Sequence, residues 1–270
     1  MIRLALLLFC LWTVPAWADW QLQPSYPQGS LAVGQVPPGS VVSIDGKRVR
    51  VAADGLFLLA VGRDAKGPLT VAVRPPGGGE TTRRIAVTPR RFKIQRIDGL
   101  PPKKVTPPPE LIKRIVADAA LIKAVRRLDS PHTDFRDGFI WPLRGRISGV
   151  FGSQRILNGK PRSPHRGVDI AAPTGTPFGA AAAGIVVLVH EDMFYSGKTV
   201  MIDHGHGLSS VYVHMNEIHV REGQRVAQGT VIGTVGQTGR ATGPHLHWGV
   251  SLFSTHVDPE MLVGPMEATQ

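Results

Sequence analysis

The chain has 270 residues, too few for three ordinary domains, so we expect two. Its 42% hydrophobic and 19% charged content describes a globular protein, and its 31 glycines and 23 prolines favour turns over helix. The formal net charge is +11, which points to an acidic partner, and the expected fold class is mainly β.

The N-terminal segment has the pattern of a secretory signal. Arg3 precedes an apolar run over 4–14, and Ala16-Trp17-Ala18 forms a small-x-small cleavage site, so the mature chain is expected to start at Asp19. The run is shorter than the roughly 20 residues of a spanning helix, so we expect no permanent membrane anchor. Cys10 lies inside this signal. Any metal site in the mature chain must therefore use His, Asp, Glu or water.

Export also bears on the partner of the positive charge. An anionic envelope polymer or a membrane surface fits an exported chain better than nucleic acid does. The basic residues of 47–50, 83–84 and 90–91 lack interleaved aromatic side chains, so no nucleic-acid partner is expected. A merely solvated basic surface is the alternative interpretation.

Residues 19–98 alternate short β-prone runs with turn signals. Runs at 41–44, 48–51 and 56–59 are separated by Asp45-Gly46 and Asp54-Gly55, which predicts a ladder of successive hairpins. Further runs at 69–73 and 84–87 complete a small antiparallel β-sandwich. Nothing in it has metal-ligand or nucleophile spacing, so binding, positioning or scaffolding is expected.

A proline-rich connector over 99–109 precedes one predicted amphipathic helix over 110–128. We expect this helix to pack between the two domains. Its apolar stripe consists of Ile112, Ile115, Val116, Ala119 and Ile122.

From Trp141 onward strands and turns return, and the chemistry-bearing residues lie here. His245 and His247 are two apart in a strand pattern and therefore share a face. They could be two metal ligands, or one ligand and one general base. His165 and Asp169 converge if the chain curls between them, and two histidines with one aspartate would complete the three protein ligands of a catalytic zinc site.

Three other histidines have weaker patterns. His214 ends a strand pattern and would lie beside the site if that strand neighbours the one carrying His247. His204 and His206 also form a His-x-His pair, but two glycines predict a hairpin turn between Met201 and Leu208 instead of a shared strand face.

Several linked motifs resemble one known family. His165-x-x-x-Asp169, Tyr212-x-His214 and the run over 239–247 together resemble the lysostaphin/LytM-type zinc endopeptidases. The resemblance covers roughly residues 141–263. The chain departs from the common pattern at Trp248-Gly249-Val250 and at Ser254-Thr255-His256.

The resemblance implies a compact antiparallel β-sandwich peptidase domain with a groove over one sheet. It implies that His165, Asp169 and His247 bind one zinc ion per chain, while His214 and His245 act on the water and the developing oxyanion. The implied substrate and partner is peptidoglycan, cleaved at cross-link or stem peptides, with a regulatory or activator protein as a further partner. The expected location is the periplasm, with secretion as the second choice.

Three rival functions remain to be weighed. A non-catalytic, peptidoglycan-binding activator of other hydrolases is the main alternative. A lipoyl- or biotinyl-type carrier would suit the run over 220–232, but no lysine follows Lys198. A basic binding module would not explain the histidines.

The expected domain division follows from these patterns. It comprises a signal peptide (1–18), an N-terminal β accessory domain (19–98), a connector with helix (99–140), the peptidase domain (141–263) and a tail (264–270).

Overall fold

The computed structural model describes residues 20–98 and 109–266. It is mainly β, as predicted, and apart from two parallel pairs its strand pairs are antiparallel. The predicted signal peptide and most of the proline-rich connector lie outside the described residues. None of the helices in the described ranges is long and apolar enough to cross a membrane.

The N-terminal part holds two facing sheets and a strand that leaves them. The first sheet has the order β1-β7-β6-β3-β4 and the second pairs β2 with β5. The strands are β1 (Ser25–Pro27), β2 (Leu31–Gln35), β3 (Val41–Ile44), β4 (Lys47–Val49), β5 (Leu56–Ala60), β6 (Leu69–Arg74), β7 (Thr81–Thr88) and β8 (Ile94–Ile97).

The predicted hairpin at Asp45-Gly46 is confirmed, because β3 and β4 pair across it. The second predicted hairpin is wrong, since β5 pairs with β2 in the other sheet and not with β4. The burial of β5 explains the difference. Phe57 and Leu59 enter the core of the N-terminal sandwich, whereas Leu58 enters the core of the C-terminal sheet. A strand buried on both faces belongs between two layers, not at the end of a ladder.

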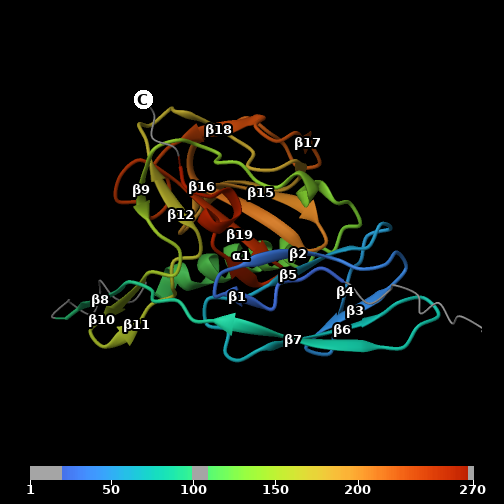
Figure 1. Cartoon of the computed structure of the whole chain (residues 1–270). Helices are drawn as coiled ribbons and strands as arrows, with labels where there is room; N and C mark the ends of the chain where they lie inside the picture. Colours follow the sequence, from blue (N-terminus) through green and yellow to red (C-terminus); the bar gives the residue numbers. More distant parts are fainter. Residues whose placement is uncertain (1–19, 99–108, 267–270) are drawn as a thin grey trace, which may run out of the picture.

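The C-terminal part is built on one ten-stranded sheet, which runs β17-β14-β15-β16-β19-β12-β9 with β13, β18 and β20 joined at its sides. Figure 1 shows this sheet above the N-terminal strands. Strands β2 and β5 lie between it and the other N-terminal strands. Its strands are β9 (Arg146–Gly149), β12 (Val168–Ala171), β13 (Pro177–Gly179), β14 (Gly184–Met193), β15 (Gly197–Gly205), β16 (Leu208–Ile218), β17 (Arg225–Val226), β18 (Val231–Val235), β19 (His245–Leu252) and β20 (Thr255–Val257).

Smaller elements complete the fold. A three-stranded sheet joins β8 in parallel to β10 (Gln154–Leu157), which pairs with β11 (Lys160–Pro161). A 3₁₀ turn, η2 (Asp134–Asp137), and a short helix, α2 (Glu260–Val263), pack beside the large sheet. Arg90 also joins the two parts, through an ion pair of 2.8 Å with Asp258. The predicted domain boundaries stay predictions. Hydrogen bonds and one hydrophobic core join the N-terminal and C-terminal parts.

Helix α1 (Pro109–Val125) confirms the predicted helix, although residues 126–128 form a tighter turn after it. The predicted apolar stripe is partly wrong: Ile112 and Val116 are exposed, and the packed end of the helix is formed by Ile122 and Val125. These two side chains lie on Met201, Val211 and Val213 of the large sheet. The contacts in the described residues therefore place α1 on the C-terminal sheet. The predicted position was instead between the two domains.

The two-sided burial of β5 can be tested by substitution. Leu58→Ala should lower the free energy of unfolding by about 2–5 kcal/mol, because it leaves a cavity at the contact between the two parts. Val33→Ala on the paired strand β2 is the control, since Val33 is 50% exposed and should change stability little. Denaturant unfolding of both variants measures this, and equal effects would contradict the packing role of Leu58.

Candidate metal centre

Three adjacent strands bring the candidate residues together on one face of the large sheet. In the β12–β19 pair, Asp169 lies opposite His247 and Ala171 lies opposite His245. On the other side of β19, Val213 of β16 lies opposite His247. Directly opposed residues point to the same face, and so do residues two apart in one strand. The predicted common face of His245 and His247 is thus confirmed.

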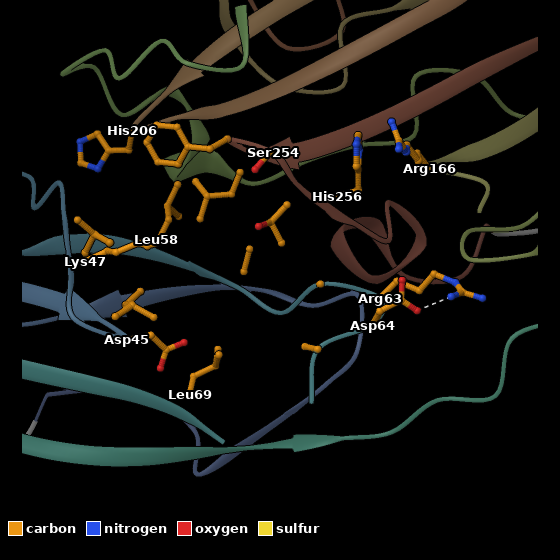
Figure 2. A pocket seen from close by; sticks show the side chains of 18 of the residues that line it. Asp45, Lys47, Leu58, Arg63, Asp64, Leu69, Arg166, His206, Ser254 and His256 are labelled. Carbon is orange, nitrogen blue, oxygen red and sulfur yellow. Dashed lines mark hydrogen bonds and ion pairs between the residues drawn. The ribbon is translucent and has the colours of Figure 1, made fainter. Parts of the chain in front are cut away.

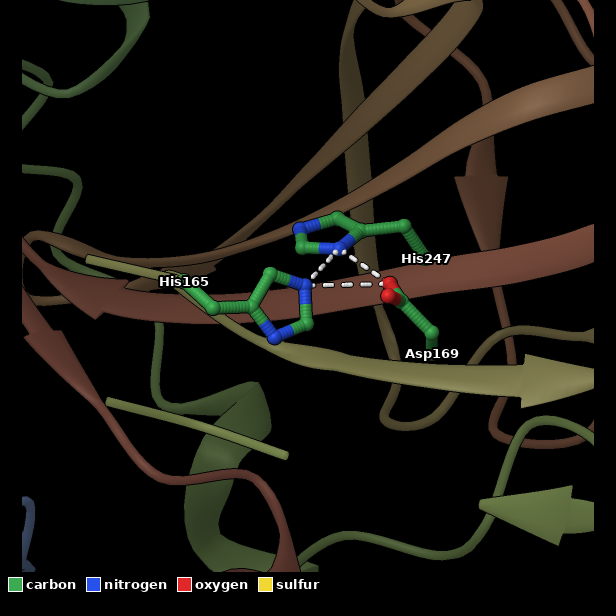
Figure 3. A group of neighbouring side chains, drawn as sticks. All are labelled: His165, Asp169 and His247. Carbon is green, nitrogen blue, oxygen red and sulfur yellow. Dashed lines mark hydrogen bonds and ion pairs between the residues drawn. The ribbon is translucent and has the colours of Figure 1, made fainter. Parts of the chain in front are cut away.

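The side chains of His165, Asp169 and His247 form a compact group (Figure 3). Asp169 Oδ1 lies 3.0 Å from His165 Nε2 and 2.8 Å from His247 Nδ1, and the two ring nitrogens are 2.9 Å apart. Among the residues that the structure describes, this is the only group of three or more His, Cys, Asp or Glu with ligand atoms all within 4.8 Å of one another. The predicted convergence of His165 and Asp169 is confirmed.

A loop ahead of β12 holds His165 by its backbone and its ring. The His165 N–H donates to Ser153 O at 2.8 Å, and Gly152 N–H donates to His165 O at 2.9 Å. Nδ1 lies 3.0 Å from Val150 O, which can only accept, so Nδ1 carries the proton. In the neutral ring, Nε2 then presents a lone pair to the group.

His214 and His245 lie beside this group. Their ring centroids are 4.8 Å apart, and the His214 ring lies 6.4 Å from that of His247. Each holds Nδ1 2.8 Å from a backbone carbonyl, of Thr238 for His214 and of Gly243 for His245. In its neutral form, each ring would therefore keep Nε2 unprotonated. His245 Nε2 is 3.8 Å from Asp169 Oδ1.

An unusual backbone conformation turns His214 towards the site. Val213 shares the face of His247, so regular strand alternation would point His214 to the opposite face. Instead His214 has φ = 62°, in the left-handed region that a side chain rarely adopts, and its N–H donates to Ser196 O at 2.8 Å. Strained residues of this kind gather at functional sites.

Burial and charge set the protonation states of the group. Burial favours the neutral carboxyl of Asp169, but its close contacts and charge interactions with the His165 and His247 rings outweigh burial and hold its pKa well below the usual range. Burial lowers the pKa of His214 to about 4 and also lowers that of His247. Burial opposes protonation of His165 as well, yet its bond to Asp169 raises the pKa overall. At neutral pH the site therefore contains an ionised carboxylate and neutral rings at His214 and His247.

His204 and His206 stand apart from this group, in the predicted turn. The β15–β16 hairpin turns at Gly205-His206-Gly207, as expected. His204 is fully buried, with Nδ1 2.6 Å from Ala183 O and Nε2 2.8 Å from Ser210 Oγ. Burial lowers its pKa to about 4, which fits a neutral structural histidine.

Sequence reasoning missed the groups that hold the histidine rings of the site in place. The carbonyls of Val150, Thr238 and Gly243 accept from His165, His214 and His245, and they have no sequence signal because every residue has a carbonyl. Two glycines are also required. A Cβ at Gly167 would lie 2.2 Å from Trp248 O, and a Cβ at Gly149 would lie 2.2 Å from Asp169 Oδ2.

Gly149→Ala tests this close approach. The added methyl should displace the Asp169 carboxylate and weaken divalent-metal binding by about 10- to 100-fold, the usual range for disturbed ligand orientation. Chelator competition measures it. Gly79→Ala is the matched control, because a Cβ there meets nothing within 4 Å. Unchanged metal affinity in Gly149→Ala would show that the carboxylate moves freely.

Comparisons with known proteins identify relatives of the part of the chain that carries the histidine group. The sequence profile described as "Peptidase family M23" matches residues 163–259, which include all five site residues. The peptidoglycan DD-endopeptidase ShyA of Vibrio cholerae serotype O1 is 42% identical over 104 residues, 38% of this chain and 24% of that protein. The DD-carboxypeptidase/endopeptidase Mpg of Neisseria meningitidis serogroup B is 42% identical over 107 residues, 39% of this chain and 24% of that protein.

These alignments therefore span about a quarter of the length of the two relatives. A crystal structure of a Pseudomonas aeruginosa protein assigned to peptidase M23 aligns far more completely. It covers 90% of this chain and 96% of its own, with 34% identity and a TM-score of 0.70. By this likeness along nearly its whole length, together with the profile match across the site, the chain belongs to peptidase family M23.

Proposed function

We propose that this chain is a zinc-dependent endopeptidase that hydrolyses cross-link or stem peptide bonds of peptidoglycan. The observation that carries the proposal is the His165–Asp169–His247 group with two further histidines beside it, in a chain of peptidase family M23. The relative named a peptidoglycan DD-endopeptidase supports the substrate class.

The chemistry of the donor set fits a metal ion. His165 Nε2 has no proton to give in its neutral form, yet it lies 3.0 Å from a carboxylate oxygen, which also only accepts. His247 Nδ1 lies within 2.9 Å of both atoms. A cation shared by the three atoms would resolve this convergence of lone pairs. Nitrogen and oxygen donors without thiolate suit zinc, with one position left for water.

Bound zinc would supply a Lewis acid for the scissile carbonyl and would lower the pKa of a water molecule to about 7. The protein supplies the proton transfers. A neutral His214 or His245 can take a proton at Nε2 from the attacking water and return it to the leaving amine, a role worth about 10²- to 10⁴-fold in rate. The protonated ring can then donate to the developing oxyanion. We assign these two tasks to the pair of histidines jointly.

The non-catalytic activator function is the weaker candidate, because all three residues proposed as ligands are present and converge. We propose that the protein acts outside the cytoplasm, in the periplasm, with peptidoglycan as its partner. This location fits the substrate class and the predicted signal segment.

Zinc content and hydrolysis should be measured on the same sample. We expect one zinc per chain and release of soluble peptides from purified sacculi, and a chelator should abolish the release because it removes the Lewis acid. Mass spectrometry of the new termini identifies the bond that is cleaved. A preparation without stoichiometric metal or hydrolysis would favour the activator function.

Single substitutions should separate the two proposed roles. His165→Ala, Asp169→Ala and His247→Ala should lose zinc and activity together, because each removes a ligand. His214→Ala and His245→Ala should keep zinc and lose at least about 100-fold in rate. Metal analysis and sacculus hydrolysis on the same preparations measure both effects. Loss of zinc in His214→Ala would overturn the division of roles.

A further inference from the structure

Two neighbouring cavities extend from the metal group along the molecule. A cavity of about 780 Å³ lies between the N-terminal strands and the large sheet, and His165 is among its lining residues. Figure 2 shows Arg166 and His256 on its side formed by the C-terminal part. A second cavity, of about 560 Å³, lies against α1. Arg166, Phe253 and Ser254 line both, so the space beside the metal group continues to the end of α1.

The second cavity has a one-sided charge. Its eight lining residues include four cations and no acidic side chain, the cations being Lys123, Arg126, Arg127 and Arg166. Lys123 lies in the last turn of α1, where a positive charge also suits the helix dipole. The dipole does not explain Arg166, which comes from the loop next to His165.

Arg126 and Arg166 have no counter-ion among the residues that the structure describes. Neither side chain forms an ion pair or hydrogen bond with another residue in the ranges 20–98 and 109–266, and Nε of Arg126 is buried without a partner. By contrast, Arg114 on the same helix pairs with Asp192 at 2.7 Å. A buried guanidinium N–H without an acceptor is unfavourable, so the site is suited to an incoming anion.

Strand register places this cluster over the metal-bearing face. His256 of β20 lies opposite Ser251 of β19, and Ser251 is four residues after His247 and therefore on its face. Val125 of α1 belongs to the same buried cluster as Val213, and Val213 lies opposite His247. Burial, then the nearby charges of Arg126 and Arg166, lower the pKa of His256 to about 3, so both guanidinium groups act on one imidazole.

We propose that Arg126 and Arg166, with His256 as a hydrogen-bonding neighbour, form a subsite that binds a free carboxylate of the substrate peptide beside the scissile bond. This inference rests on the proposed function. Guanidinium groups match the planar carboxylate with paired N–H donors, and stem peptides of peptidoglycan carry free carboxylates close to their cleavable bonds. The subsite would therefore favour stem peptides with an ionised free carboxylate over stem peptides in which that group is amidated.

Binding, not cleavage, gives the direct test. Calorimetry on the zinc-loaded full chain compares two synthetic stem peptides that differ only in having free carboxylates or carboxamides. We expect the free acid to bind at least about tenfold more tightly, the usual effect of a charge-assisted hydrogen bond. Arg126→Gln should remove most of this preference, and Arg126→Lys should keep part of it.

Lys113→Gln is the matched control, because it removes one positive charge from the exposed surface of the same helix, away from both cavities. It should keep the preference. Equal affinity for the two peptides, including no measurable binding of either, or a preference that survives Arg126→Gln, would overturn the subsite. A preserved preference without sacculus hydrolysis would instead overturn the proposed function and leave the subsite standing.

Discussion

The register between β12 and β19 is the constraint on which the site depends. It sets Asp169 opposite His247, and a slip of one residue would send one of these side chains to the other face of the sheet. Close approach of the backbones requires Gly167 against Trp248 O, and the Asp169 carboxylate requires the open space at Gly149. The two glycines thus belong to the site as much as the charged residues do.

Around this pair, the backbone orients three of the histidine rings of the site. Val150, Thr238 and Gly243 each offer a carbonyl to Nδ1 of a histidine, so the tautomer of three rings is determined by main-chain geometry. A backbone acceptor cannot be lost by substitution of its own side chain. The loops that carry these carbonyls must therefore keep their shape for the rings to keep their protons in place.

Much of the site followed from the sequence, because spacing in a strand has a direct geometric meaning. His245-x-His247 needed only the alternation of side chains, and the Asp45-Gly46 hairpin needed only turn chemistry. The orientation of His214 could not be predicted, since it depends on a left-handed φ that histidine seldom adopts. The partner of β5 was also beyond sequence reasoning, because the apolar run around Leu58 does not say which layer covers each face.

Helix α1 shows the same limit. Its sequence contains more apolar residues than contact the sheet. Polar contacts set the orientation of the helix on the sheet: Asp118 accepts the Phe194 N–H at 2.7 Å, and Arg114 pairs with Asp192. Ile112 and Val116 consequently remain exposed. The unpaired state of Arg126 is likewise a tertiary property, because it depends on which acidic residues come near.

The parallel pairing of β8 with β10 couples the N-terminal sandwich to the histidine loop. β10 lies between the Val150 carbonyl and His165, and Arg63 donates to Gly152 O at 2.8 Å in the same segment. The N-terminal part therefore supports the loop that carries His165 through direct strand and side-chain contacts. A displacement of the sandwich would therefore pull on the chain segment that positions His165, so the geometry of the histidine group depends on the N-terminal part staying in place.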